Sequence, residues 1–137
     1  MEKSKIELIK EFIETCPLLK NGMVNVDYIK DKPQSYSIDE TPSTTILKPY
    51  TDGGSRNQIL FDFSIQANFS VLENIKNSKF CDDFLKWIKE QNNKGNLPKI
   101  DGICWIKCTG RGTILQTTET TAIYVIPMQV VYDEEAF

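Results

Sequence analysis

Two pairs of adjacent carboxylates, Asp82-Asp83 and Glu134-Glu135, are the side chains best suited to general acid–base chemistry in this sequence. The chain contains no histidine, which excludes Ser-His-Asp and Cys-His catalysis as well as histidine-ligated zinc. Adjacent residues on a helix do not face each other, so Asp82 and Asp83 are not placed to share a proton. A helix start, where the dipole favours acidic side chains, accounts for their position. We therefore predict no catalytic residue and no enzyme activity.

Two glycine-rich turns, Gly53-Gly54 and Gly110-Arg111-Gly112, raise the question of phosphate binding. A P-loop ends in Gly-Lys-Ser or Gly-Lys-Thr, and a dinucleotide-binding turn has the spacing GxGxxG between a strand and a helix. Neither pattern is present in the sequence. Because glycine commonly serves turns that need a positive φ, both segments are predicted to be ordinary turns without a cofactor.

The cysteines are predicted to be reduced and structural, and they are Cys16, Cys81, Cys104 and Cys108. Cys104 and Cys108 lie about 13 Å apart at the rise of a strand, too far for a disulfide or a shared tetrahedral metal. The charged N-terminus predicts no secretion signal, and no apolar run is long enough to span a membrane. We expect no bound metal and no membrane partner.

The charge balance argues against a protein that binds nucleic acid specifically. The formal net charge is -3, the sequence pI is near 5.0, and only Arg56 and Arg111 among the 16 basic residues are arginine. Nucleic-acid binders usually carry a basic excess, and phosphate clamps favour arginine. The length of 137 residues predicts one domain, residues 1–137, with a core that needs no metal or disulfide.

The apolar periodicity predicts elements in the order helix, strands, helix, strands. Ser4 and Glu7 have the spacing of a capping box before an amphipathic helix. Apolar and polar residues alternate over residues 58–68, which is typical of a strand. A second helical region begins at Ser70, with a predicted break at residues 77–78. Turn-rich connections favour antiparallel pairing, so we predict an α+β fold of two layers, a mainly antiparallel sheet with helices packed on one face.

The last predicted strand is apolar on both faces, which is unusual for a small domain of two layers. Ile123, Val125 and Val131 lie on one face. The other face carries five large residues: Tyr124, Ile126, Met128, Val130 and Tyr132. A strand of this kind is normally covered on both faces. Either a neighbouring subunit covers one face, which makes the five residues an oligomer interface, or helices cover one face and loops the other. Pro127 within the strand predicts an edge position or a bulge.

Several longer strings make the chain resemble a known family. They are IKEFIETCPLL (9–19), VNVDY (24–28) followed by YSIDETP (36–42), QILFDFSIQANF (58–69) and NIKNSKFCDDFLKWIKEQNNKGNLP (74–98). These strings resemble a small minor capsid or tail protein of phages and prophages of low-GC Gram-positive bacteria. That family is similar to the tail terminators of long-tailed phages, and the resemblance covers nearly the whole chain.

The resemblance implies a structural virion protein, assembled in the cytoplasm of the bacterial host, that forms a hexameric ring. Such a ring caps the tail tube and joins it to the head-side connector or collar. The implied partners are further copies of the chain, the tail tube protein and the connector or collar protein, with a sheath protein as a further candidate. Ring contacts would be head-to-tail and closed by rotation. Two loops would face these partners, and their residues are Asp52, Gly53, Gly54, Arg56 and Arg111.

Three other interpretations stay open at this point. A neck or head-to-tail adaptor belongs to the same class of virion protein. A monomeric binding module would have polar strand faces and one small-ligand pocket. An enzyme that uses carboxylates alone would need a cleft with clustered Asp and Glu. The sequence also does not distinguish a phage with a head from a headless, phage-tail-like bacteriocin.

Overall fold

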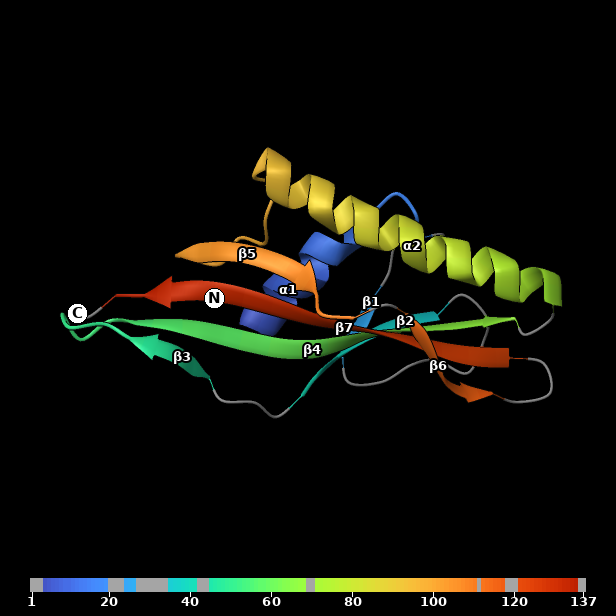
Figure 1. Cartoon of the computed structure of the whole chain (residues 1–137), viewed down its shortest axis with the longest axis horizontal. Helices are drawn as coiled ribbons and strands as arrows, with labels where there is room; N and C mark the ends of the chain where they lie inside the picture. The colour runs from blue at the N-terminus through green and yellow to red at the C-terminus, as the bar shows by residue number, and fades with distance from the viewer. Residues whose placement is uncertain are drawn as a thin grey trace.

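Two strands of 14 residues each, β4 (Ser55–Asn68) and β7 (Thr121–Glu134), form the centre of the computed structural model. They pair antiparallel along their full length, from Ser55 opposite Glu134 to Asn68 opposite Thr121. The structure describes residues 4–19, 24–26, 35–41, 45–68, 71–110, 112–117 and 121–135. The long central pair fixes the positions of both edges of the sheet (Figure 1).

Shorter strands extend the central pair on both sides into a seven-stranded sheet. They are β1 (Val24–Val26), β2 (Ser35–Glu40), β3 (Ile46–Pro49), β5 (Ile103–Cys108) and β6 (Thr113–Thr117). β2 and β3 both pair with the outer edge of β4, while β5 and β6 both pair with the outer edge of β7. All these pairings are antiparallel except that of β1 with β2. The prediction of a mainly antiparallel sheet is confirmed.

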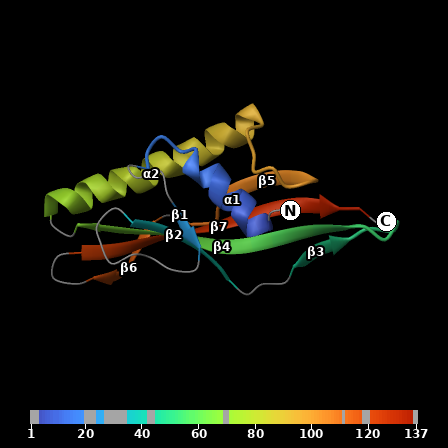
Figure 2. The same cartoon turned by 180° about the vertical axis from the view of Figure 1, so that it is seen from behind.

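Two helices lie on one face of the sheet, α1 (Lys5–Glu14) and α2 (Val71–Lys94) (Figures 1 and 2). Ser4 caps α1 as predicted, because its Oγ accepts a hydrogen bond from the Glu7 N–H at 3.3 Å. The predicted break at residues 77–78 is wrong, since α2 runs through them without interruption. Asn and Ser are weak helix formers, but packing of the helix on the sheet overrides their local preference.

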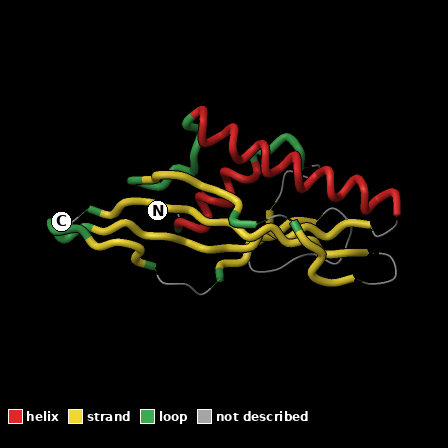
Figure 3. The backbone as a smooth tube through the Cα atoms, viewed as in Figure 1, coloured by secondary structure: helices red, strands yellow, loops and turns green. Residues whose placement is uncertain are grey.

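Aromatic side chains join the two layers into one hydrophobic core. Phe63 of β4 and Phe84 of α2 have ring centroids 4.7 Å apart, and Phe12 of α1 lies 5.2 Å from Trp87 of α2. Both distances are typical of stabilising aromatic pairs. The α+β fold of two layers, with the helices on one face of the sheet, is therefore confirmed (Figure 3).

The core also corrects the prediction of an oligomer interface on β7. The five residues concerned are each at most 6% exposed within a single chain, and they are Tyr124, Ile126, Met128, Val130 and Tyr132. They belong to the same core cluster as α1 and α2, because the two helices cover this face of the strand. The helices thus supply the cover for this face within one chain, and of the five side chains Tyr132 also borders a surface hollow.

Pro127 lies in a central strand, so the predicted edge position is wrong. Its carbonyl accepts a hydrogen bond from the Thr109 N–H at 2.8 Å, on the side of β7 that faces β5 and β6. In an antiparallel strand the N–H and C=O of one residue point to the same side. The missing N–H of Pro127 therefore faces the place where the chain passes from β5 to β6. The sheet tolerates the proline because its ladder is interrupted there.

Candidate interaction surface

The first predicted contact loop is the tight turn that leads from β3 into β4. Tyr50 N–H donates to the Gly54 carbonyl at 2.8 Å, and Asp52 Oδ1 accepts from the Gly54 N–H at 2.9 Å. Gly53 has a φ of 93°, which glycine adopts without strain. Asp52 and Gly53 are exposed and accessible to a partner, whereas Gly54 is buried and serves the turn itself.

Arg56 lies in β4 rather than in the loop, and its guanidinium is engaged within the chain. Its Nε donates to Asp133 Oδ1 at 3.0 Å, and its Nη2 donates to Asp133 Oδ2 at 3.4 Å. The guanidinium also lies over the ring of Trp105, 5.5 Å from the centroid. Tyr50 Oη donates to Asp133 Oδ1 at 3.0 Å. Arg56 therefore joins β4 to the end of β7, and its contact with a partner stays a prediction.

The pKa shifts of Arg56 and Asp133 are those expected for an ion pair between them. The hydrogen bond from Arg56 lowers the pKa of the Asp133 carboxyl below its usual range, against the opposing effect of lost hydration. The same hydrogen bond raises the pKa of the Arg56 guanidinium. Because both side chains are more than a third exposed, solvent screens the pair, and its contribution to stability is small.

The second predicted contact loop lies elsewhere on the sheet. Arg111 itself lies outside the described residues, but its neighbour Gly110 is next to Pro127, where an added Cβ would come within 3.1 Å of the proline Cγ. Arg56 lies opposite Asp133. Pro127 and Asp133 are roughly 20 Å apart along the strand. The structure therefore does not bring the two predicted loops together on one surface.

The two carboxylate pairs considered for catalysis lie on different elements, one on α2 and one at the end of β7. Asp82 is exposed and Asp83 half-buried on α2, and Glu134-Glu135 lies exposed at the end of β7. Within the described ranges, no cluster of Cys, Asp or Glu could hold a metal ion. Burial raises the pKa of the Cys81 thiol to about 11 and that of Cys108 to about 12. Both thiols are protonated at neutral pH and are poor nucleophiles.

The two edges of the sheet present apolar side chains to solvent. Ile46 and Leu47 on β3 are 52% and 46% exposed, and Ile114 on β6 is 47% exposed. These three are the large hydrophobic residues that stand out as exposed among the described residues. β3 pairs with β4, whereas β6 pairs with β7, so the two apolar positions lie on opposite edges. Exposed apolar residues at a strand edge are typical of interaction surfaces.

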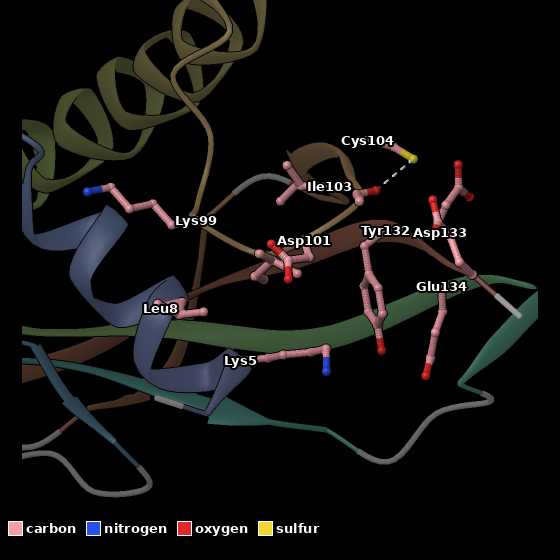
Figure 4. A pocket seen from close by; sticks show the side chains of 12 residues that line it. Lys5, Leu8, Lys99, Asp101, Ile103, Cys104, Tyr132, Asp133 and Glu134 are labelled. Carbon is pink, nitrogen blue, oxygen red and sulfur yellow. Dashed lines mark hydrogen bonds between the residues drawn. The ribbon is translucent and has the colours of Figure 1, made fainter. Parts of the chain in front are cut away.

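A hollow of about 930 Å³ lies beside the start of β5, between α1 and the end of β7 (Figure 4). Its apolar wall is formed by Leu8, Ile100, Ile103 and Tyr132. Carboxylates also line it, namely Asp101, Asp133, Glu134 and Glu135. Lys5 and Lys99 are the cations in the lining, and Lys5 Nζ lies 5.3 Å from the ring centroid of Tyr132. In Figure 4, Tyr132 and Glu134 extend to the same side of β7, while Asp133 extends to the other.

No protein-family model matches the chain, and no curated protein matches it with significance. None of the helices in the described ranges combines the length and the hydropathy that crossing a membrane requires.

Sequence reasoning missed both features that define the candidate interaction surface. A four-residue strand with exposed side chains has no periodicity that reveals its free edge, and β3 is such a strand. The hollow combines residues of α1, of the segment before β5 and of β7, which are far apart in the sequence. The one available signal was the pair of adjacent apolar residues Ile46-Leu47 within an otherwise polar stretch.

Proposed function

We propose that this protein is a structural subunit of a phage tail or phage-tail-like particle, the tail terminator that forms a ring at the end of the tail tube. The ring joins the tube to the head-side connector or collar. The proposal combines the resemblance of the sequence to minor capsid and tail proteins with the α+β fold, which that resemblance implies. It places the protein in the virion, in contact with further copies of itself and with the tube protein.

The observation that carries the proposal is the pair of unlike apolar edges on one subunit. Ile46 and Leu47 are exposed on the β4 side of the sheet, and Ile114 on the β7 side. A contact that joins one edge of a subunit to the opposite edge of the next is heterologous, and such contacts form a ring when the rotation closes. The same contact removes exposed apolar surface from water at both edges, which stabilises the assembly.

Negative-stain microscopy of the purified full-length chain tests the proposal, alone and mixed with its cognate tail tube protein. We expect closed rings of uniform diameter in the first sample and rings at tube ends in the second. The variant Leu47→Ser at the exposed edge is expected to reduce the fraction of rings, whereas Leu85→Ser in the helical layer reports on folding instead. A chain that stays monomeric under both conditions would contradict the proposal.

A neck or head-to-tail adaptor is the second candidate, because it would use the same unlike edges for ring contacts. The two candidates differ in position along the particle. Cryo-electron microscopy of whole particles distinguishes them, since a terminator lies against the last ring of the tube and an adaptor lies on the head side of it.

A further inference from the structure

We infer that the exposed strip of β3, formed by Ile46, Leu47 and Lys48, docks into the hollow beside β5 on a second copy of the chain. This inference rests on the proposed ring and names the residues of its subunit contact. The next copy in the ring occupies the hollow. In this orientation the β4 edge of one subunit meets the β7 edge of its neighbour.

The strip offers two apolar side chains followed by a cation. Ile46 and Leu47 are about half exposed, and Lys48 is exposed as well. Among the residues that the structure describes, none forms an ion pair with Lys48. Pro49 follows directly and limits the strand. The strip is therefore short and exposed, with two apolar side chains next to a cation, which is a composition suited to an interface.

The hollow offers the complementary chemistry. Leu8, Ile103 and Tyr132 supply an apolar wall for the two aliphatic side chains. Among its ionisable lining residues, four carboxylates outnumber two lysines. Asp133 is occupied by Arg56, and Glu134 Oε2 accepts from Asn57 Nδ2 at 2.7 Å. The exposed carboxylates of Asp101 and Glu135 are thus the best partners for Lys48, because a lysine can bury its stem along an apolar wall and keep its ammonium near the rim.

The topology makes the contact intermolecular. β3 is fixed on the outer edge of β4 by the pairs Lys48–Arg56 and Pro49–Ser55. The hollow lies beside β5 on the opposite edge, so β4 and β7 separate it from β3. A chain therefore cannot place its own strip in its own hollow. β3, the start of β5 and the end of β7 lie toward the same end of the sheet (Figure 1), so two subunits placed side by side can bring the strip of one against the hollow of the next.

Charge reversal tests the contact by sedimentation velocity over a series of protein concentrations, under conditions in which the wild-type chain forms rings. Lys48→Glu should weaken self-association about tenfold or more, since like charges across an interface oppose docking. The double variant Asp101→Lys with Glu135→Lys should weaken it similarly. Combining all three substitutions should restore association, because the pair is then reversed rather than broken. Lys89→Glu on the exposed side of α2 is the matched control and should behave as the wild type.

The outcomes separate this inference from the proposed ring. Normal ring formation by Lys48→Glu, or failure of the triple variant to recover, would overturn the β3 contact and leave the ring proposal standing. Absence of rings in the wild-type chain, alone and with tube protein, would overturn both. Thermal unfolding of each variant, monitored by circular dichroism, checks that a loss of association is not a loss of folding.

Discussion

Asn92 of α2 hydrogen bonds to both backbone groups of Ile106 on β5. Its Oδ1 accepts from the Ile106 N–H at 3.1 Å, and its Nδ2 donates to the Ile106 carbonyl and, at 2.9 Å, to the Ile88 carbonyl. The side-chain amide therefore takes the place of a neighbouring strand along the outer edge of β5. An unpaired edge invites strand addition by another chain, and this contact blocks it at Ile106.

Asn92→Ala should destabilise the protein by about 1–3 kcal/mol, because it leaves the backbone groups of a fully buried residue without partners. Urea unfolding measures the loss, and amide exchange at Ile106 should become faster. Asn93→Ala is the control, since Asn93 is exposed at the next position of the same helix and the helix propensity of Ala is favourable at both sites. Equal midpoints for the two variants would contradict this role of Asn92.

Gly102→Ala should be far more damaging than Gly95→Ala, although both glycines have nearly the same positive φ, 77° and 76°. An added Cβ at Gly95 meets no atom within 4 Å, so that variant should cost about 1–2 kcal/mol from the backbone conformation alone. At Gly102 the Cβ would collide with the backbone carbonyl of Asp133, whose N–H donates to the Gly102 carbonyl at 2.8 Å. Thermal unfolding compares them, and similar midpoints would argue against this close approach.

Asp133→Asn should lower stability at neutral pH and have little effect in acid. The pKa of Asp133 is lower in the folded chain than its ordinary value, because Arg56 hydrogen bonds to the charged form. Its stabilising contribution is therefore present above the ordinary pKa and is lost as the pH falls through the lowered one. Unfolding temperatures recorded between pH 2 and pH 7 test this, with Asp101→Asn as a control. A loss that is independent of pH would point to packing rather than charge.

Asp62→Asn should have the opposite effect, a gain in stability at neutral pH. Asp62 lies directly opposite Asp39 across β4 and β2, and partial burial raises the pKa of its carboxyl. A raised folded pKa means that the carboxylate costs stability as the pH rises from the ordinary value through the raised one. The gain should be about 0.5 kcal/mol or less, the scale of a cross-strand pair. Nuclear magnetic resonance titration of the carboxyl would contradict the argument if it gave an ordinary pKa.

Local chemistry made much of the fold predictable. The Ser4 cap and the alternation over residues 58–68 depend on neighbouring residues alone, and both appear as expected. The burial of Tyr124 and Val130 within the chain was not decided by the sequence, because period-two alternation marks an apolar face but does not tell which element covers it. That cover comes from α1 and α2, whose packing on β7 is a tertiary property.

The candidate surface was harder to predict for the same reason. Arg56 was expected to face a partner because the resemblance implied a contact loop there, yet its guanidinium binds Asp133, which lies near the other end of the sequence. In the sequence, Asn92 cannot be told from other polar residues on the exposed face of a helix. Its role depends on β5, whose Ile106 backbone lies close enough to hydrogen bond to the Asn92 amide. Contacts between residues distant in sequence decide both cases.

The full-length pairing of β4 with β7 also bears on how the protein is made. The first residue of β4, Ser55, pairs with Glu134, the last residue of β7, so the central ladder cannot close until all of β7 has left the ribosome. Pairing across such sequence distances is slow, and an apolar strand that stays unpaired during this time is prone to aggregation. A nascent chain of this protein is therefore expected to need protection during synthesis, and loss of the last three residues of β7 would leave Ser55, Arg56 and Asn57 of β4 without their strand partners.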